Sequence, residues 1–189
     1  IPESFQGYSL LDQNGQAVQV QDDGGGTLAA VELAPLSFTT FKKGNKADLE
    51  NNKNKDLILE NDMVRYEFDQ TGQLISMYDK GLDKEFLSDS GNVLSLYEDR
   101  PNNWDAWDVD FFYREALIET AKAIKVEASV NGEVTKQIKL SFSIGGSSIE
   151  QLVSLYPHSK RLDFATHVEW NEKHKMLRVH FPVSIRSEQ

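Results

Sequence analysis

Apolar and polar residues alternate with a period of two over most of the chain after residue 57. Val64, Tyr66 and Phe68 alternate with Arg65 and Glu67, and the same pattern returns in several later segments. This period is typical of strands that turn one face to a core and the other to water. We predict strands at residues 64–68, 74–78, 124–130, 138–144, 149–156, 162–170 and 177–185.

Turn residues stand between these segments. Thr71-Gly72 separates the first two, and Asn131-Gly132 is a strong signal for a short hairpin between 124–130 and 138–144. No window shows convincing helical periodicity. Strands at this spacing, joined by hairpin turns, predict an all-β fold, an antiparallel β-sandwich.

Residues 1–43 form shorter apolar runs with their own turns, at Asn14-Gly15 and at 22–26. The stretch Thr27–Phe41 is predicted as one or two strands interrupted near Pro35. Short strands over so few residues do not make an independent sandwich. We expect this small β segment to pack against a partner rather than to fold alone.

A polar stretch divides the chain. Residues 44–56 read GNKADLENNKNKD, with almost no apolar side chain, which is typical of a mobile linker or a long loop. The predicted organisation is a small β segment at 1–44, a polar linker or loop at 45–56, and a β-sandwich domain at 57–189.

Charge and composition narrow the classes of partner. The net charge of −10 argues against binding to nucleic acid or to anionic membranes, which both reward basic patches. The chain has no apolar run long enough for a membrane span. It has no cysteine, which fits a reducing compartment, and we expect a cytoplasmic protein. The start at Ile1-Pro2 suggests a segment of something longer.

The most informative stretch is 98–110, which reads EDRPNNWDAWDVD. It combines two tryptophans with five acids and one base. Carboxylates are costly to bury without partners, whereas tryptophan gains from leaving water. Three interpretations stay open: a loop whose tryptophans cap the sandwich, a loop that packs on a neighbouring domain, and a loop that touches sugar. The candidate contact residues are Arg100, Trp104, Asp105, Trp107 and Asp108.

Histidines raise the question of a metal site. His167 shares a strand face with Asp163 and Glu169, while His174 and His180 follow shortly after. Three histidines near carboxylates could ligate zinc. However, no His-x-His or His-x-x-x-His pair holds two ligands on one face, so the favoured interpretation is a solvated outer sheet face. We assign no metal ligand and no catalytic residue.

Four segments carry a family resemblance. Residues 59–80, beginning Leu-Glu-Asn-Asp-Met-Val-Arg-Tyr, resemble the hairpin that opens the C-terminal β-region of glycoside hydrolase family 38 α-mannosidases. Residues 98–113 are similar to the tryptophan–aspartate segment of the cytosolic and bacterial branch of that family. Residues 156–164 and 170–179 resemble its later strands, although Asn171 stands where members often have His. The resemblance covers about residues 57–187.

This resemblance has specific implications. Family members are retaining α-mannosidases whose aspartate nucleophile and divalent metal, usually Zn²⁺, lie in an N-terminal α/β barrel and the helical region after it. The chain would then be a non-catalytic, truncated sandwich of the galactose mutarotase-like kind. It would hold no cofactor itself, while the parent would bind Zn²⁺. Its partners would be the barrel and, in the parent, a mannoside at a site whose rim it shapes.

Two other functions remain as alternatives. A stand-alone carbohydrate-binding module would use the same tryptophans as a stacking platform. An aldose mutarotase-like enzyme would need an acid–base pair across a cleft, with His167 or His180 as candidates. In addition, a sandwich edge left open by truncation would favour self-association of the fragment.

Overall fold

The computed structural model describes residues 3–22, 26–46, 56–104 and 107–185. Across this part of the chain the regular elements are strands and two short 3₁₀ helices, and every strand pairing is antiparallel. The prediction of an all-β antiparallel sandwich is therefore confirmed. Neither 3₁₀ helix of these residues is long enough to cross a membrane.

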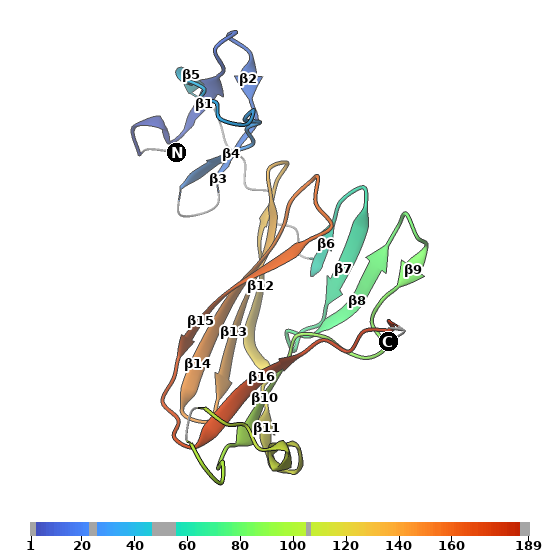
Figure 1. Ribbon diagram of the computed structural model, residues 1–189. Helices are drawn as coiled ribbons and strands as arrows, with labels where there is room; N and C mark the ends of the chain where they lie inside the picture. The colour runs from blue at the N-terminus through green and yellow to red at the C-terminus, as the bar shows by residue number, and fades with distance from the viewer. Residues whose placement is uncertain (1–2, 23–25, 47–55, 105–106, 186–189) are drawn as a thin grey trace.

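The small N-terminal segment comes first (Figure 1). Its elements are η1 (Glu3–Phe5), β1 (Tyr8–Leu11), β2 (Ala17–Val18), β3 (Val20–Asp22), β4 (Thr27–Ala29) and β5 (Lys42–Lys46). Strands β2, β1 and β5 form one sheet, and β3 pairs with β4. The predicted Asn14-Gly15 turn joins β1 to β2, because the Asp12 carboxylate accepts bonds from the backbone N–H groups of Asn14 and Gln16.

Two details of this segment differ from the sequence prediction. Only residues 27–29 of the predicted strand region 27–41 form a strand, and Leu36 and Phe38 are almost fully exposed. Among the described residues no strand pairs with residues 31–41, so their apolar side chains have no sheet to join. In contrast, β5 extends through Lys46, so the first residues of the polar stretch are a strand rather than a loop. Its backbone pairs with β1, and such pairing needs no apolar side chain.

One layer of the sandwich is a sheet of four consecutive hairpin strands. They are β12 (Ala123–Asn131), β13 (Lys136–Ile144), β14 (Ser147–Leu155) and β15 (Leu162–Glu169). The hairpin predicted at Asn131-Gly132 is present, although its loop has four residues, 132–135, because Asn131 pairs with Lys136. Inward residues of β13 and β14 are buried while their neighbours in sequence are more exposed, as the period of two predicts.

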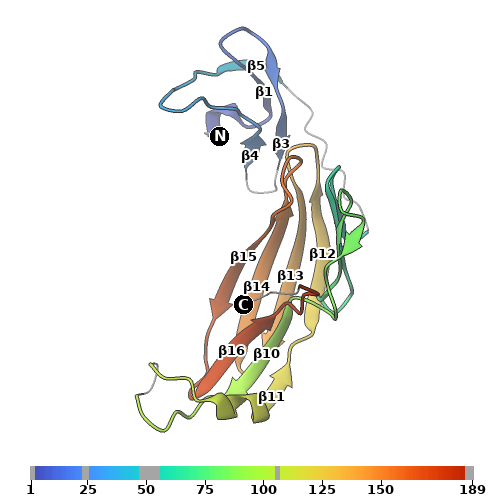
Figure 2. The ribbon, with the colours of Figure 1, turned by 45° about the vertical axis from the view of Figure 1, so that its right-hand side comes forward.

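The opposite layer consists of two smaller sheets. The first contains β6 (Ile58–Glu60), β7 (Val64–Phe68), β8 (Leu74–Asp79) and β9 (Lys84–Glu85). The second, in the order β11-β10-β16, contains β10 (Val93–Glu98), β11 (Leu117–Thr120) and β16 (Lys175–His180), with η2 (Phe111–Glu115) between β10 and β11. Isolated bridges, Leu74 to Gly91 and Leu87 to Val183, connect the two sheets. In Figures 1 and 2 both small sheets lie beside the four-stranded sheet of β12 to β15.

A single apolar core fills the space between these layers. It joins side chains from all three sheets: Leu59, Val64, Tyr66, Phe68, Leu74, Leu94, Leu96, Ala121, Ile138, Leu140, Phe142, Ile144, Ile149, Val153 and Leu155. One polar bridge crosses it. Asn92, at a positive φ of 53°, donates from Nδ2 to the Gly72 carbonyl oxygen at 3.0 Å and to Gln151 Oε1 at 2.9 Å. Asparagine tolerates this backbone region better than most residues.

The N-terminal segment is attached to the sandwich by two glutamines: Gln19 Nε2 donates to Glu133 Oε2 at 3.1 Å, and Gln21 is buried against the β12–β13 loop. Gln21 Nε2 donates to the Thr135 carbonyl oxygen at 2.9 Å, while its Oε1 accepts from the N–H groups of Val134 and Thr135 at 2.9 and 3.0 Å. A Cβ at Gly132 would lie 2.0 Å from that oxygen. The glycine of the β12–β13 loop therefore leaves room for the Gln21 side chain in this position, and the small segment contacts the sandwich of its own chain.

We predict that Gly72→Ala destabilises the sandwich. Gly72 has a φ of +80°, and an added Cβ would lie 2.7 Å from Phe142 Cζ in the core. Strain and overpacking together should lower the free energy of unfolding by about 3 kcal/mol, measured by urea denaturation. Gly81→Ala is the matched control, because its Cβ would meet only Asp79 Oδ1 at an ordinary 3.4 Å. Equal losses in the two variants would contradict this packing account.

Candidate functional site

The described candidate contact residues, Arg100, Trp104, Trp107 and Asp108, belong to the connection between β10 and β11, which lies at the end of the sandwich opposite to the N-terminal segment (Figures 1 and 2). Trp104 adopts a φ of +61°, and its carbonyl oxygen accepts from the N–H groups of Trp107 at 3.0 Å and Asp108 at 3.1 Å. The Asn102 N–H donates to Asp110 Oδ2 at 2.7 Å. These bonds hold the backbones of the two tryptophans close together.

Both indole side chains are exposed. Trp104 is 74% and Trp107 is 86% accessible to solvent. The interpretation in which the tryptophans cap the sandwich is therefore wrong. The acidic residues around them explain why, since folding the loop onto the core would also bury carboxylates without partners.

The other predicted contact residues have different surroundings. Arg100 Nε forms an ion pair with Glu98 Oε1 at 2.8 Å, and its side chain is mostly exposed. Asp108 is exposed on the same connection, whereas Asp105 lies outside the described residues. A hollow of about 130 Å³ beside Arg100 is lined by Glu98, Asp99, Asp110, Phe112, Tyr113 and Ala116. Its volume is below the range of ordinary ligand pockets.

The sequence analysis overlooked how far the apolar surface extends. Further large side chains are at least half exposed along 109–118: Val109, Phe111, Phe112, Leu117 and Ile118. The rings of Phe111 and Phe112 lie 4.2 Å apart between centroids. We call these five residues with Trp104 and Trp107 the aromatic surface. The adjacent Phe111-Phe112 pair in the sequence could have indicated an exposed aromatic side chain. In a strand, two such neighbours point to opposite faces, so one of them faces away from the core.

A polar and aromatic cluster anchors the base of this surface to the sheet. The Arg178 guanidinium donates to the Tyr113 hydroxyl and lies 4.9 Å from the centre of the Tyr113 ring. Tyr97 stands edge-on to Tyr113 at 5.4 Å, and its hydroxyl is 3.2 Å from His180 Nε2. These contacts connect η2 with β10 and β16. The aromatic surface is thus presented by a braced loop.

The histidines do not converge. His167 is exposed on β15, His180 contacts Tyr97 on β16, and His174 adopts a positive φ in the connection between these strands. Within the part of the chain that the structure describes, no three His, Asp or Glu side chains are grouped to hold a metal ion. The interpretation of a solvated sheet face fits His167, which is exposed, whereas His180 is half-buried beside Tyr97.

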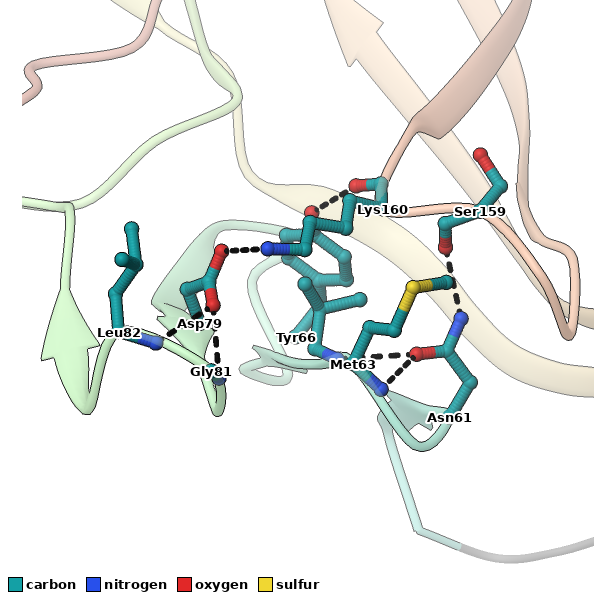
Figure 3. A network of polar contacts seen from close by, with 9 residues as sticks. Asn61, Met63, Tyr66, Asp79, Gly81, Leu82, Ser159 and Lys160 are labelled. Carbon is teal, nitrogen blue, oxygen red and sulfur yellow. Dashed lines mark hydrogen bonds and ion pairs between the residues drawn. The ribbon is translucent and has the colours of Figure 1, made fainter.

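A second group of polar contacts holds the loop between β14 and β15 against the facing sheet (Figure 3). Asn61 Nδ2 donates to the carbonyl oxygens of Tyr156 and Ser159, both at 2.8 Å. Asn61 Oδ1 accepts from the N–H groups of Met63 and Val64. The Tyr66 hydroxyl donates to the Lys160 carbonyl oxygen at 2.5 Å. One amide therefore shapes the β6–β7 turn and ties it to a distant loop.

Asp79 completes this network (Figure 3). Its Oδ2 lies 2.7 Å from Lys160 Nζ, and its Oδ1 accepts from the N–H groups of Gly81 and Leu82 at 2.9 and 3.1 Å. The hydrogen bond from Lys160 is the main cause that lowers the pKa of the Asp79 carboxyl, and the two backbone bonds act in the same direction. Asp79 is thus a charged contact between the two layers.

These features define the class of protein: a β-sandwich domain with a braced, exposed aromatic surface at one end. Comparison with protein families identifies which one. Residues 59–189 match the glycosyl hydrolases family 38 C-terminal domain, and the chain belongs to this family. The resemblance noted in the sequence is therefore confirmed.

Individual proteins similar to this chain are alpha-mannosidases, in agreement with the family match. The chain is 29% identical over 149 residues to alpha-mannosidase G of Dictyostelium discoideum, a match that covers 72% of the chain. It is 32% identical over 138 residues to human alpha-mannosidase 2C1, covering 69% of the chain. A yeast alpha-mannosidase is 28% identical over 134 residues. The matched region is only 13% of the length of the first two relatives.

The Asp79 contacts predict a specific dependence of stability on pH. The pKa of Asp79 is lowered from its ordinary value of 3.8, so the carboxylate contributes stability above that value. This contribution is lost as the pH falls through the folded-state pKa. The free energy of unfolding of the wild type should exceed that of Asp79→Asn at about pH 6 and approach it below about pH 3, as measured by urea denaturation.

Lys160→Met is the companion variant for this measurement. It removes the ammonium group but keeps the backbone N–H groups that bind Asp79. The acid-dependent loss should therefore be smaller than in the wild type but still present. A difference between wild type and Asp79→Asn that stays constant between about pH 6 and pH 3 would contradict the assignment.

Proposed function

We propose that this chain is a non-catalytic β-sandwich portion of a longer, cytoplasmic α-mannosidase. The proposal rests first on family membership and on relatives that are named alpha-mannosidases. The full-length protein would be a retaining enzyme that hydrolyses terminal α-D-mannosides. Its catalytic carboxylates and a divalent metal such as Zn²⁺ would lie in an N-terminal barrel, outside these residues.

The aromatic surface is the observation that carries the proposed role. Monomeric proteins rarely leave a contiguous group of large apolar side chains in water without a use for it. Burying one tryptophan removes roughly 150–250 Å² from water, which is worth about 4–6 kcal/mol before ordering costs. Two tryptophans and two phenylalanines on a braced loop are therefore suited to be the centre of an interface. We propose that they pack on the barrel.

The charges around this surface support an interface next to a sugar site. Asp108 is exposed beside the indoles, and Arg100 and Glu98 form an exposed ion pair at the base of the loop. Interfaces commonly surround an aromatic centre with such a polar rim. The adjoining hollow of about 130 Å³ is too small to enclose a sugar alone. Arg100, Trp104, Asp105, Trp107 and Asp108 would thus shape the rim of a site whose floor lies in the barrel.

We predict that Trp104→Ala and Trp107→Ala, made in the full-length parent, lower kcat/KM for an α-mannoside roughly tenfold or more each, since each removes a central anchor. The thermal midpoint of the sandwich should change little, because both side chains are exposed. Leu82→Ala is the control, since Leu82 is also exposed but lies on the β8–β9 turn. Unchanged kinetics in both tryptophan variants would contradict the proposed contact with the barrel.

Hydrolysis of p-nitrophenyl-α-mannoside separates this proposal from its alternatives. The isolated 189-residue chain should be inactive with and without added Zn²⁺, while the full-length parent should be active. Turnover by the isolated chain would refute the assignment as a non-catalytic portion. Saturable mannoside binding by the isolated chain that depends on Trp104 and Trp107 would instead favour a carbohydrate-binding module.

A further inference from the structure

A cleft of about 520 Å³ lies between the N-terminal segment and the sandwich, at the end opposite to the aromatic surface. Its walls come from three places: Gln19 before β3, residues 60–62 at the end of β6, and the β12–β13 and β14–β15 loops with the strand ends beside them. A neighbouring hollow of about 820 Å³ shares Gln19, Glu133, Tyr156, Pro157 and His158 with it. These volumes fall within the range of small-molecule sites.

Three polar side chains on the rim of this cleft have no hydrogen-bond or ion-pair partner within the described residues. They are the carboxylate of Asp62, the hydroxyl of Tyr156 and the imidazole of His158. Tyr156 also leaves 41% of its surface in contact with water. A carboxylate, an imidazole and an aromatic ring around one hollow are therefore available to a ligand.

The network in Figure 3 holds these groups in place before any ligand arrives. Asn61 anchors the carbonyl oxygen of Tyr156, while Tyr66 and Asp79 hold Lys160 just beyond His158. On the opposite wall, Gln21 fixes the β3–β4 hairpin to the β12–β13 loop. Because these walls are already ordered, little conformational entropy is lost when a ligand binds. A small ligand that makes few contacts can then still bind.

The charge of the cleft selects the class of ligand. Glu60, Asp62 and Glu133 line it together with the ammonium of Lys136, which is bound to the Glu60 carbonyl oxygen at 2.6 Å. The Glu60 carboxylate is paired with Lys80 Nζ at 2.7 Å, so Asp62 and Glu133 are the two negative charges that Lys136 alone opposes in the lining. Phosphates and carboxylates would therefore be repelled. Hydroxyl groups of a neutral sugar can donate to carboxylates, and the apolar face of a pyranose ring packs on an aromatic side chain.

We propose that this cleft binds a neutral hexopyranoside at a non-catalytic subsite, with Tyr156 as the platform and Asp62 and His158 as hydrogen-bonding groups. The choice of an α-mannoside as the sugar rests on the proposed function. The site would hold a mannosyl residue at the end of the sandwich away from the aromatic surface. It would thereby raise the local concentration of a branched or extended substrate.

The test titrates methyl α-D-mannopyranoside into the 189-residue chain while backbone amide signals are followed by NMR. We expect saturable shifts at Gly132 and His158, with roughly millimolar affinity. Tyr156→Ala and Asp62→Asn should each weaken binding roughly tenfold, because each removes one ligand contact. Ile124→Ala is the matched control, because Ile124 is exposed at the start of β12 and does not line the cleft, and it should bind as the wild type does.

Each outcome decides one point. Saturable shifts at the cleft that depend on Tyr156 and Asp62 support the subsite. Shifts confined to residues 102–113, or an absence of saturable shifts in a chain whose amide spectrum is that of a folded protein, overturn it. Neither of these results would affect the proposed accessory role, because that role is tested by the kinetics of the tryptophan variants in the parent.

Discussion

Burial of the inward faces of β13 and β14 is the constraint on which the rest of the structure depends. These two strands supply Ile138, Leu140, Phe142 and Ile144 from one and Ile149, Val153 and Leu155 from the other. The facing layer is divided into two small sheets, and each buries its apolar face only by packing against β13 and β14. Because a shared apolar core covers them together, the loops that leave this layer are held at defined positions.

The two ends of the sandwich have different chemical character for this reason. At one end, the cluster of Tyr97, Tyr113 and Arg178 braces the β10–β11 connection and leaves its aromatic side chains in water. At the other end, Asn61 and Gln21 close loops onto the sandwich and surround a polar cleft. The first end is suited to a protein surface and the second to a small hydrophilic ligand. The proposed contact with a catalytic barrel and the proposed sugar subsite would thus lie at opposite ends of the domain.

Much of the sandwich could be predicted because its strands repeat a local rule. The segments around β7, β13, β14 and β15 alternate with a period of two, and their observed bounds differ from the predicted ones by few residues. The N-terminal segment was predicted less well. Apolar residues at 31–41 suggested strands, but a strand also needs a partner, and none pairs with them in the described residues. The polar residues of β5 gave no apolar signal, although their backbone pairs with β1.

The sequence by itself determined the fold class, the turns and the loop that carries Trp104 and Trp107, because periodicity and turn chemistry are local properties. Only the tertiary structure decided that these indoles are exposed rather than buried against the sandwich, since that depends on where charged neighbours can be solvated. It also decided which distant residues meet. The contacts of Asn61 with Tyr156 and of Gln21 with Thr135 join segments about a hundred residues apart. No local pattern encodes such pairs, because they arise only when the layers pack.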